Sequence, residues 1–100
     1  MRFTYVRADK AIGIDGNFLY FDSIDFDSQV DAIQWYDTWG EIEFVNRQER
    51  NNERFEDISY IQPLIKLWEY EDTRIKAEEA AAAIANSAVA AALSESEVTE

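Results

Sequence analysis

The chain has 100 residues, 47% of them hydrophobic and 14% aromatic, which suffices for one small folded domain and excludes a wholly disordered chain. It has no cysteine, so disulfides and thiolate metal sites are excluded, and no histidine, the usual base near neutral pH. Its net charge of −12 repels phosphate, which disfavours nucleic acid and anionic membranes as partners. We therefore expect no catalytic residues, no cofactor, no metal and no enzyme activity.

The first part of the chain, residues 1–46, is predicted to form an antiparallel β region. Aromatic and β-branched residues alternate there with short turn signals. Asp15-Gly16-Asn17 is the clearest turn, because Gly16 and Asn17 tolerate positive φ. The strands expected around this turn lie at residues 3–6, 11–14 and 18–21.

A second hairpin is expected between residues 32–36 and 41–45, after a polar, acidic connector at 22–29. Asp37 and Gly40 occupy the first and fourth positions of its four-residue turn, where type I turns favour them.

A bulge at Gly40 would set the register of this hairpin. Tyr36 would then lie opposite Ile42, and Gln34 opposite Phe44. Apolar side chains would point to both faces, so we expect the hairpin to be covered on both sides.

A polar linker at 47–58 is expected next, then a long helix at 59–93 and an acidic tail at 94–100 that frays. The linker is predicted because residues 46–54 contain no apolar side chain. Pro63 fits the first turn of the helix, where its missing N–H costs nothing.

The helix has an apolar period of seven residues. The residues that share this period are Ile61, Trp68, Ile75, Ala82 and Val89. Near its start, four apolar side chains are expected to fix the helix to the sheet: Ile61, Leu64, Ile65 and Trp68. Opposite charges four residues apart, Arg74 with Glu78 and Asp72 with Lys76, are expected to support it.

The helix is predicted to be longer than the body it packs on. Thirty helical residues extend about 45 Å, whereas a globule of some 60 residues is about 25 Å across. The alanine-rich end is then either a solvated extension without a role or a surface for a partner helix or its own copies. The residues proposed for that close-packing surface are Ala81, Ala85, Val89 and Ala92. Glu71 and Glu78, at the complementary heptad positions, count against a simple continuous coiled coil.

Two other groups of residues invite a chemical interpretation. The aspartates from Asp22 to Asp31 do not match a calcium loop: counted from Asp25, the sixth position is Val30 instead of glycine and the twelfth is Tyr36 instead of glutamate. Among the aromatic residues, Trp35 is expected in the core, while Trp39 is interpreted either as core or as an exposed anchor for a partner.

The chain is expected to be soluble and made in the cytoplasm. Its start has no uninterrupted apolar run typical of a signal peptide, and Ala80 to Leu93 is too short to cross a bilayer.

The order of these parts resembles a family of small tailed-bacteriophage proteins that accompany tail-fibre genes, described as tail or tail-fibre assembly proteins. The resemblance is carried by Ala32-Ile33-Gln34-Trp35 and Gly40-Glu41-Ile42-Glu43-Phe44, followed by a polar loop and an acidic, alanine-rich helix. It implies a non-enzymatic role as an assembly chaperone or minor tail component. The implied partner is a phage tail or tail-fibre protein, and the implied location is the host cytoplasm during assembly, then the virion tail.

The fold predicted is α+β: a small antiparallel sheet of four to five strands followed by one long C-terminal helix. The partner-binding residues predicted are Trp39, Ala81, Ala85, Val89 and Ala92, and self-association through the helix is a further expectation. The alternative function is an acidic mimic of nucleic acid that inhibits a host protein. That alternative requires the acids between Asp15 and Glu43 to line one face at phosphate spacing.

Overall fold

The computed structural model describes the backbone of residues 1–98 and the side chains of residues 1–88. The chain is α+β, as expected, and divides into two compact units, residues 1–69 and a second unit beginning at Tyr70. The elements of the chain, in order, are β1 (Arg2–Val6), β2 (Ala11–Ile14), β3 (Asn17–Tyr20), β4 (Val30–Tyr36), β5 (Gly40–Phe44), β6 (Glu53–Phe55), the 3-10 helix η1 (Ile58–Ile61) and α1 (Gln62–Val98).

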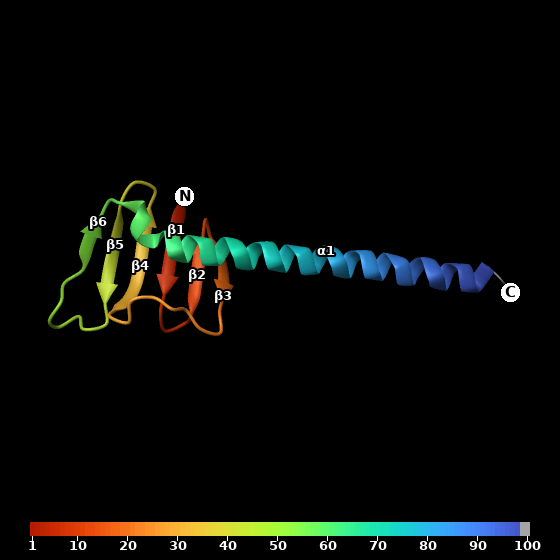
Figure 1. Cartoon of the computed structure of the whole chain (residues 1–100), viewed down its shortest axis with the longest axis horizontal. Coiled ribbons are helices and arrows are strands. Elements are labelled where there is room, and N and C mark those ends of the chain that lie inside the picture. The colour runs from red at the N-terminus through yellow and green to blue at the C-terminus, as the bar shows by residue number, and fades with distance from the viewer. Residues whose placement is uncertain (99–100) are drawn as a thin grey trace. The chain divides into compact units, whose positions relative to one another are not determined.

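The strands form one antiparallel sheet in the order β3-β2-β1-β4-β5-β6 (Figure 1). Within the described residues the sheet has six strands rather than four to five, because β6 lies inside the segment expected to be a polar linker, 47–58. Phe55 is the apolar residue that gives this short strand a place in the core. Its ring centroid lies 5.3 Å from that of Trp35, so the ring covers the end of the β4–β5 hairpin.

The β2–β3 hairpin forms where it was predicted, but its turn residues are Asp15 and Gly16 rather than Gly16 and Asn17, because Asn17 is already the first residue of β3. Asp15 and Gly16 have φ angles of 50° and 84°, as a two-residue turn with both central residues at positive φ requires. Ile14 and Asn17 lie opposite each other at the ends of the two strands.

The register of the β4–β5 hairpin differs from the prediction. Trp35 lies opposite Gly40, and the irregularity falls at Asp31, between Val30 and Ala32, instead of at Gly40. A Cβ at Gly40 would lie 2.5 Å from Cε1 of Phe55, so the glycine makes room for that ring.

Because of this register, residues 1–69 cover the hairpin on one side only. Ile33, Trp35 and Ile42 point to the covered face and are buried. Gln34 and Glu41 pair on the opposite face and are half-buried. The expectation that both sides would be covered is therefore wrong.

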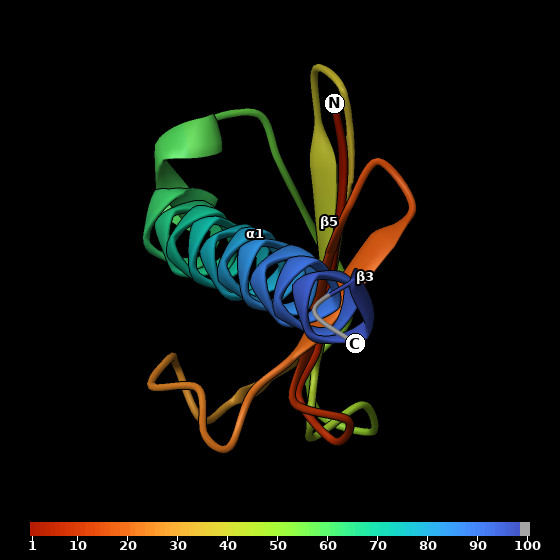
Figure 2. The ribbon, with the colours of Figure 1, turned by 90° about the vertical axis from the view of Figure 1, so that its right-hand side faces the viewer.

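The covered face of the sheet packs against η1 and the first turns of α1 (Figure 2). Ile61, Leu64 and Ile65 are 0%, 1% and 5% exposed, and Trp68 Nε1 donates a hydrogen bond of 3.0 Å to the carbonyl oxygen of Asn17. The four predicted anchors of the helix are thus confirmed. The buried residues they meet on the sheet are Phe3, Tyr5, Ile12, Val30, Ile33, Trp35, Ile42 and Phe44.

The connector between β3 and β4 lies over the same face. The ring of Phe26 makes edge contacts with Tyr5 and Tyr60, at centroid distances of 5.7 Å and 5.6 Å. The connector, expected to be simply polar, thus also contributes apolar side chains to the core, Ile24 and Phe26 among them. The opposite face of the sheet, here called the open face, has neither helix nor connector over it within residues 1–69 (Figure 2).

The boundaries of the helix also differ from the prediction. The chain enters through η1, and α1 begins at Gln62 with Pro63 as its second residue. It continues to Val98, five residues beyond the predicted end at Leu93, because the serines and glutamates of the expected tail do not interrupt a helix as glycine or proline would. Thr99 and Glu100 lie outside the described residues.

The packing of the helix on the sheet predicts that Leu64→Ala strongly destabilises the protein. Removing this buried side chain should lower the free energy of unfolding by about 2–5 kcal/mol, measured by urea denaturation. Ile84→Ala, in the same helix at a residue 72% exposed, is the matched control and should change it by less than about 0.5 kcal/mol. Equal effects of the two substitutions would show that the helix does not hold the core.

The cap of η1 predicts a pH effect. The backbone N–H of Ser59 donates to the Asp57 carboxylate at 3.0 Å, which lowers the pKa of Asp57. Since the folded pKa is lowered, this contribution to stability is present above the unfolded pKa, about 3.9, and is lost as pH falls through the folded pKa.

Asp57→Asn keeps an acceptor oxygen and removes this titration, whereas Asp57→Ala removes the cap at every pH. The free energy of unfolding of wild type relative to Asp57→Asn should therefore decrease as the pH falls below about 4. Chemical denaturation at a series of pH values measures this difference in the free energy of unfolding. A difference that stays constant with pH would contradict the prediction.

Candidate functional site

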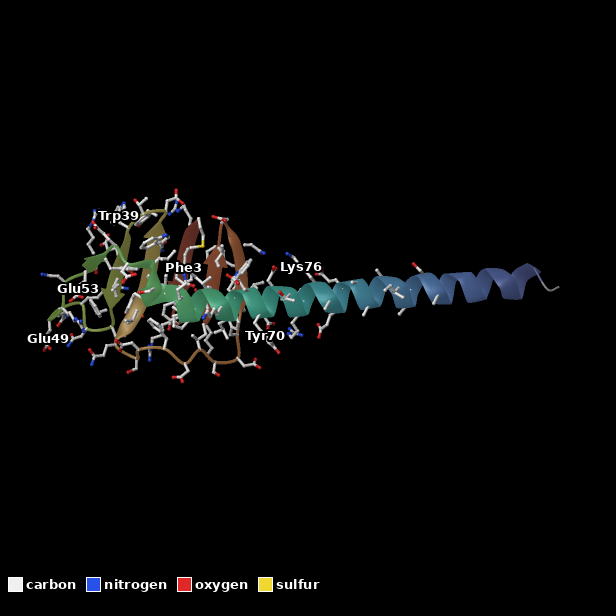
Figure 3. The ribbon with its side chains drawn as sticks, turned by 45° about the horizontal axis from the view of Figure 1, so that its top comes forward. Phe3, Trp39, Glu49, Glu53, Tyr70 and Lys76 are labelled. Carbon is white, nitrogen blue, oxygen red and sulfur yellow. The ribbon has the colours of Figure 1, made fainter. Side chains whose placement is uncertain are left out.

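Two surfaces carry the residues selected from the sequence, one in each unit. The first is an aromatic–arginine cluster, defined here as Arg2, Tyr36, Trp39 and Arg54, on the open face near the β4–β5 turn. Figure 3 shows Trp39 at that turn. The second is the alanine surface of α1, defined here as the described part of the alanine-rich stretch, residues 77–88.

Rings and guanidinium groups alternate in the aromatic–arginine cluster. The centroids of the Tyr36 and Trp39 rings are 4.7 Å apart. The Cζ atom of Arg2 lies 5.2 Å from the Tyr36 centroid, and that of Arg54 lies 4.3 Å from the Trp39 centroid. The strands impose this order, because Arg2 pairs with Tyr36 across β1 and β4.

The cluster holds Trp39 in one place. The indole of Trp39 is half-buried. This exposure is intermediate between the core position and the exposed anchor that the sequence left open. Each cation–π contact is worth about 0.5–1 kcal/mol at an exposed site, and the ring pair about 0.5–1.5 kcal/mol. Trp39 is therefore a preorganised surface side chain, and Trp35, 3% exposed, is the core tryptophan that was predicted.

Acidic groups surround the cluster. Arg54 also pairs with Glu56 at 3.2 Å, and the Asp37 carboxylate pairs with the Met1 amino group and raises the pKa of that amine. Glu41, in the neighbouring strand, accepts a hydrogen bond of 2.7 Å from Asn52. The cluster thus presents aromatic rings and guanidinium groups to a binding partner, and acidic side chains surround them.

The alanine surface forms part of the second unit. Every side chain from Lys76 to Ala88 is exposed, including Ile84 at 72%. Ala81 and Ala85 are one turn apart and share one side of the helix. Val89 and Ala92, the other two residues predicted for this surface, lie outside the residues whose side chains the structure describes.

The turns before this surface carry ion pairs. Arg74 pairs with Glu78 at 2.6 Å and with Glu71, and Lys76 pairs with Asp72 at 2.8 Å. The two predicted four-residue pairs are confirmed. The Arg74 hydrogen bond lowers the pKa of Glu71, and Asp72 raises the pKa of Lys76.

The acids from Asp15 to Glu43 do not share one face. Glu41 and Glu43 point to the open face, because they alternate with the buried Ile42. The connector that contains Asp25 and Asp27 packs through Phe26 on the covered face. Their distribution does not meet the requirement stated for a nucleic-acid mimic.

Among the residues that the structure describes, no three or more acidic side chains are grouped so that they could hold a metal ion. Over the same part of the chain, no helix has the length and apolar character needed to span a bilayer.

The predicted partner-binding residues fall in different units, with Trp39 in the first and Ala81 and Ala85 in the second. Sequence reasoning missed Arg2 and Arg54 as neighbours of Trp39. The alternation of Arg54 with Phe55 places Arg54 on the open face, but that signal can be used only when β6 is recognised as a strand.

Comparison of the chain with protein-family models, curated protein sequences and solved structures found no match.

A double-mutant cycle tests the cluster. Trp39→Ala and Arg54→Gln should each lower stability, with a coupling energy of about 0.5–1 kcal/mol for the lost cation–π contact. Free energies of unfolding from denaturant titrations provide the measurement. The matched cycle uses Arg47→Gln, because Arg47 pairs with Asp31 at the other end of the hairpin. If the coupling energy between Trp39 and Arg47 equals that between Trp39 and Arg54, the assigned cation–π contact between Trp39 and Arg54 is wrong.

Proposed function

We propose that the protein is a non-enzymatic bacteriophage tail component, an assembly chaperone or a minor structural part, that binds a tail or tail-fibre protein. The resemblance of the β4–β5 hairpin sequence and of the order of elements to small tail-associated proteins supports this proposal. In it, the protein acts in the host cytoplasm during assembly and enters the virion tail as a structural part or leaves as a chaperone.

The exposed alanine surface carries the proposal. From residue 80 to residue 88 its side chains are mostly small, so the backbone of a partner helix can approach closely, and Ile84 supplies an apolar side chain that is 72% exposed. Isolated helices in water are marginal even when they are rich in alanine, so contact with a partner would stabilise this one. Among the helix residues whose side chains the structure describes, the charged ones end at Glu79, near the start of this surface, and Arg74 with Glu78 and Lys76 with Asp72 pair along the helix itself.

The aromatic–arginine cluster is the proposed second contact. Tryptophan, tyrosine and arginine are enriched among the residues that dominate binding energies at protein interfaces. Because Trp39 is already held by Tyr36 and Arg54, little side-chain entropy would be lost on binding.

Charge substitutions on the helix test the proposal in the full-length chain. Ala81→Glu with Ala85→Glu places two carboxylates on the proposed side and should weaken binding to the cognate tail-fibre protein by at least tenfold. That factor corresponds to about 1.4 kcal/mol of desolvation and repulsion. Isothermal titration calorimetry measures it.

The matched control is Ala83→Glu with Ser87→Glu, which adds the same charge about half a turn away on the helix. All four residues are exposed, so both variants should keep the wild-type stability. Equal affinities of the two variants would refute binding through this side of the helix. Mass spectrometry of purified virions then distinguishes a structural part from a chaperone that leaves.

A further inference from the structure

The two edges of the sheet differ in how they are protected. β6, at one edge, has three residues and carries Glu53 and Arg54, which are typical of an edge that resists further pairing. β3, at the other edge, is Asn17-Phe18-Leu19-Tyr20 and contains no charged residue and no proline. The β3 edge therefore lacks the features that usually prevent strand addition.

The backbone of β3 can accept another strand. The N–H of Phe21 donates to the carbonyl oxygen of Lys10 at 2.9 Å, which makes these two residues a hydrogen-bonded pair. Such pairs alternate along an antiparallel ladder, so Leu19 pairs with Ile12 in the same way. The N–H and C=O groups of Phe18 and Tyr20 consequently point away from β2, spaced as a new strand requires.

The side chains of the same two residues are exposed. Phe18 is 43% and Tyr20 68% exposed, and both point to the open face. The Phe18 ring lies over Gly13, where an added Cβ would be 2.6 Å from Cε1. An incoming strand would thus find two aromatic rings beside its own alternate side chains.

Charge indicates what kind of strand fits. Asp15 precedes β3, and Asp22 follows it by two residues. Antiparallel pairing of β3 with a second copy around Leu19 would bring Asp22 of each copy to the Asp15-Gly16 turn of the other. Like charges would meet at both ends, between chains of charge −12. A partner segment with basic residues at both ends would instead be attracted.

We propose that β3 is a docking edge for an extended segment of another protein, apolar in its middle and basic at both ends, which adds a seventh strand to the sheet. Main-chain hydrogen bonds to Phe18 and Tyr20 would hold the segment, as in other strand-addition complexes. Asp15 and Asp22 would select its ends. Docking at this edge involves neither the alanine surface nor any particular tail protein.

A capped peptide of sequence KVTVTVK provides the probe, titrated into the isotope-labelled full-length chain. Binding should slow hydrogen exchange at the amides of Phe18 and Tyr20 by at least tenfold. The amide of Leu19, which faces β2, should change little. The peptide EVTVTVE, with the same core and acidic ends, should bind at least tenfold more weakly, and added salt should reduce this difference.

Two sets of variants separate the backbone from the charges. Tyr20→Pro removes an outward N–H that the β2–β3 ladder does not use, and Tyr20→Thr is its matched control. The proline variant should bind KVTVTVK at least tenfold more weakly than the threonine variant. Asp15→Asn with Asp22→Asn should bind it at least threefold more weakly than wild type. The Asp15→Asn change keeps a side-chain oxygen to accept from the Arg2 N–H, as the carboxylate does.

Three results would overturn the proposal. They are no binding of KVTVTVK at millimolar concentration, equal binding of the acidic peptide, and protection of Phe18 and Tyr20 by concentration-dependent dimerisation without peptide. If Tyr20→Pro fails to fold, the double asparagine variant and the two peptides still decide the question.

Discussion

The contact between the apolar face of the sheet and the short stretch from Ile61 to Trp68 is the interaction on which the first unit depends. A single sheet cannot bury its own apolar face, so its strands need a cover. Ile61 and Leu64 supply that cover at the centre, and the Trp68 indole fastens the helix to the β2–β3 turn by its hydrogen bond to Asn17. The connector completes the cover through Phe26. With one face closed, the other remains available for binding.

Features governed by local chemistry could be predicted from the sequence. Asp15 and Gly16 define a tight turn whatever lies around them, and the apolar period near Ile61 identifies the buried side of the helix. The register of the β4–β5 hairpin could not be predicted in this way. It depends on Phe55, which reaches the space above Gly40 from a strand fifteen residues later in the chain.

The same reasoning explains what was found and missed at the candidate site. Trp39 stands out in the sequence because it lies in the predicted turn, where its large ring could anchor a partner. Arg54 appears in the sequence as one of several bases in a polar run, and only its pairing with β5 through β6 brings it to the indole. Ala81 and Ala85 were selected from composition, and their exposure agrees with a surface that remains available. A short strand after a polar stretch is difficult to recognise because its pairing partner lies elsewhere in the chain.

The distance in sequence between Trp68 and Asn17, 51 residues, has a kinetic consequence. Contacts across so long a loop form slowly, since chain entropy must be lost before the contacts stabilise anything. The later turns of α1 need only neighbours three or four residues away, and helical segments of that kind relax in about a microsecond. The first turns of α1 therefore become stable only when the sheet has formed. The later turns of the same helix can form and unfold many times before that.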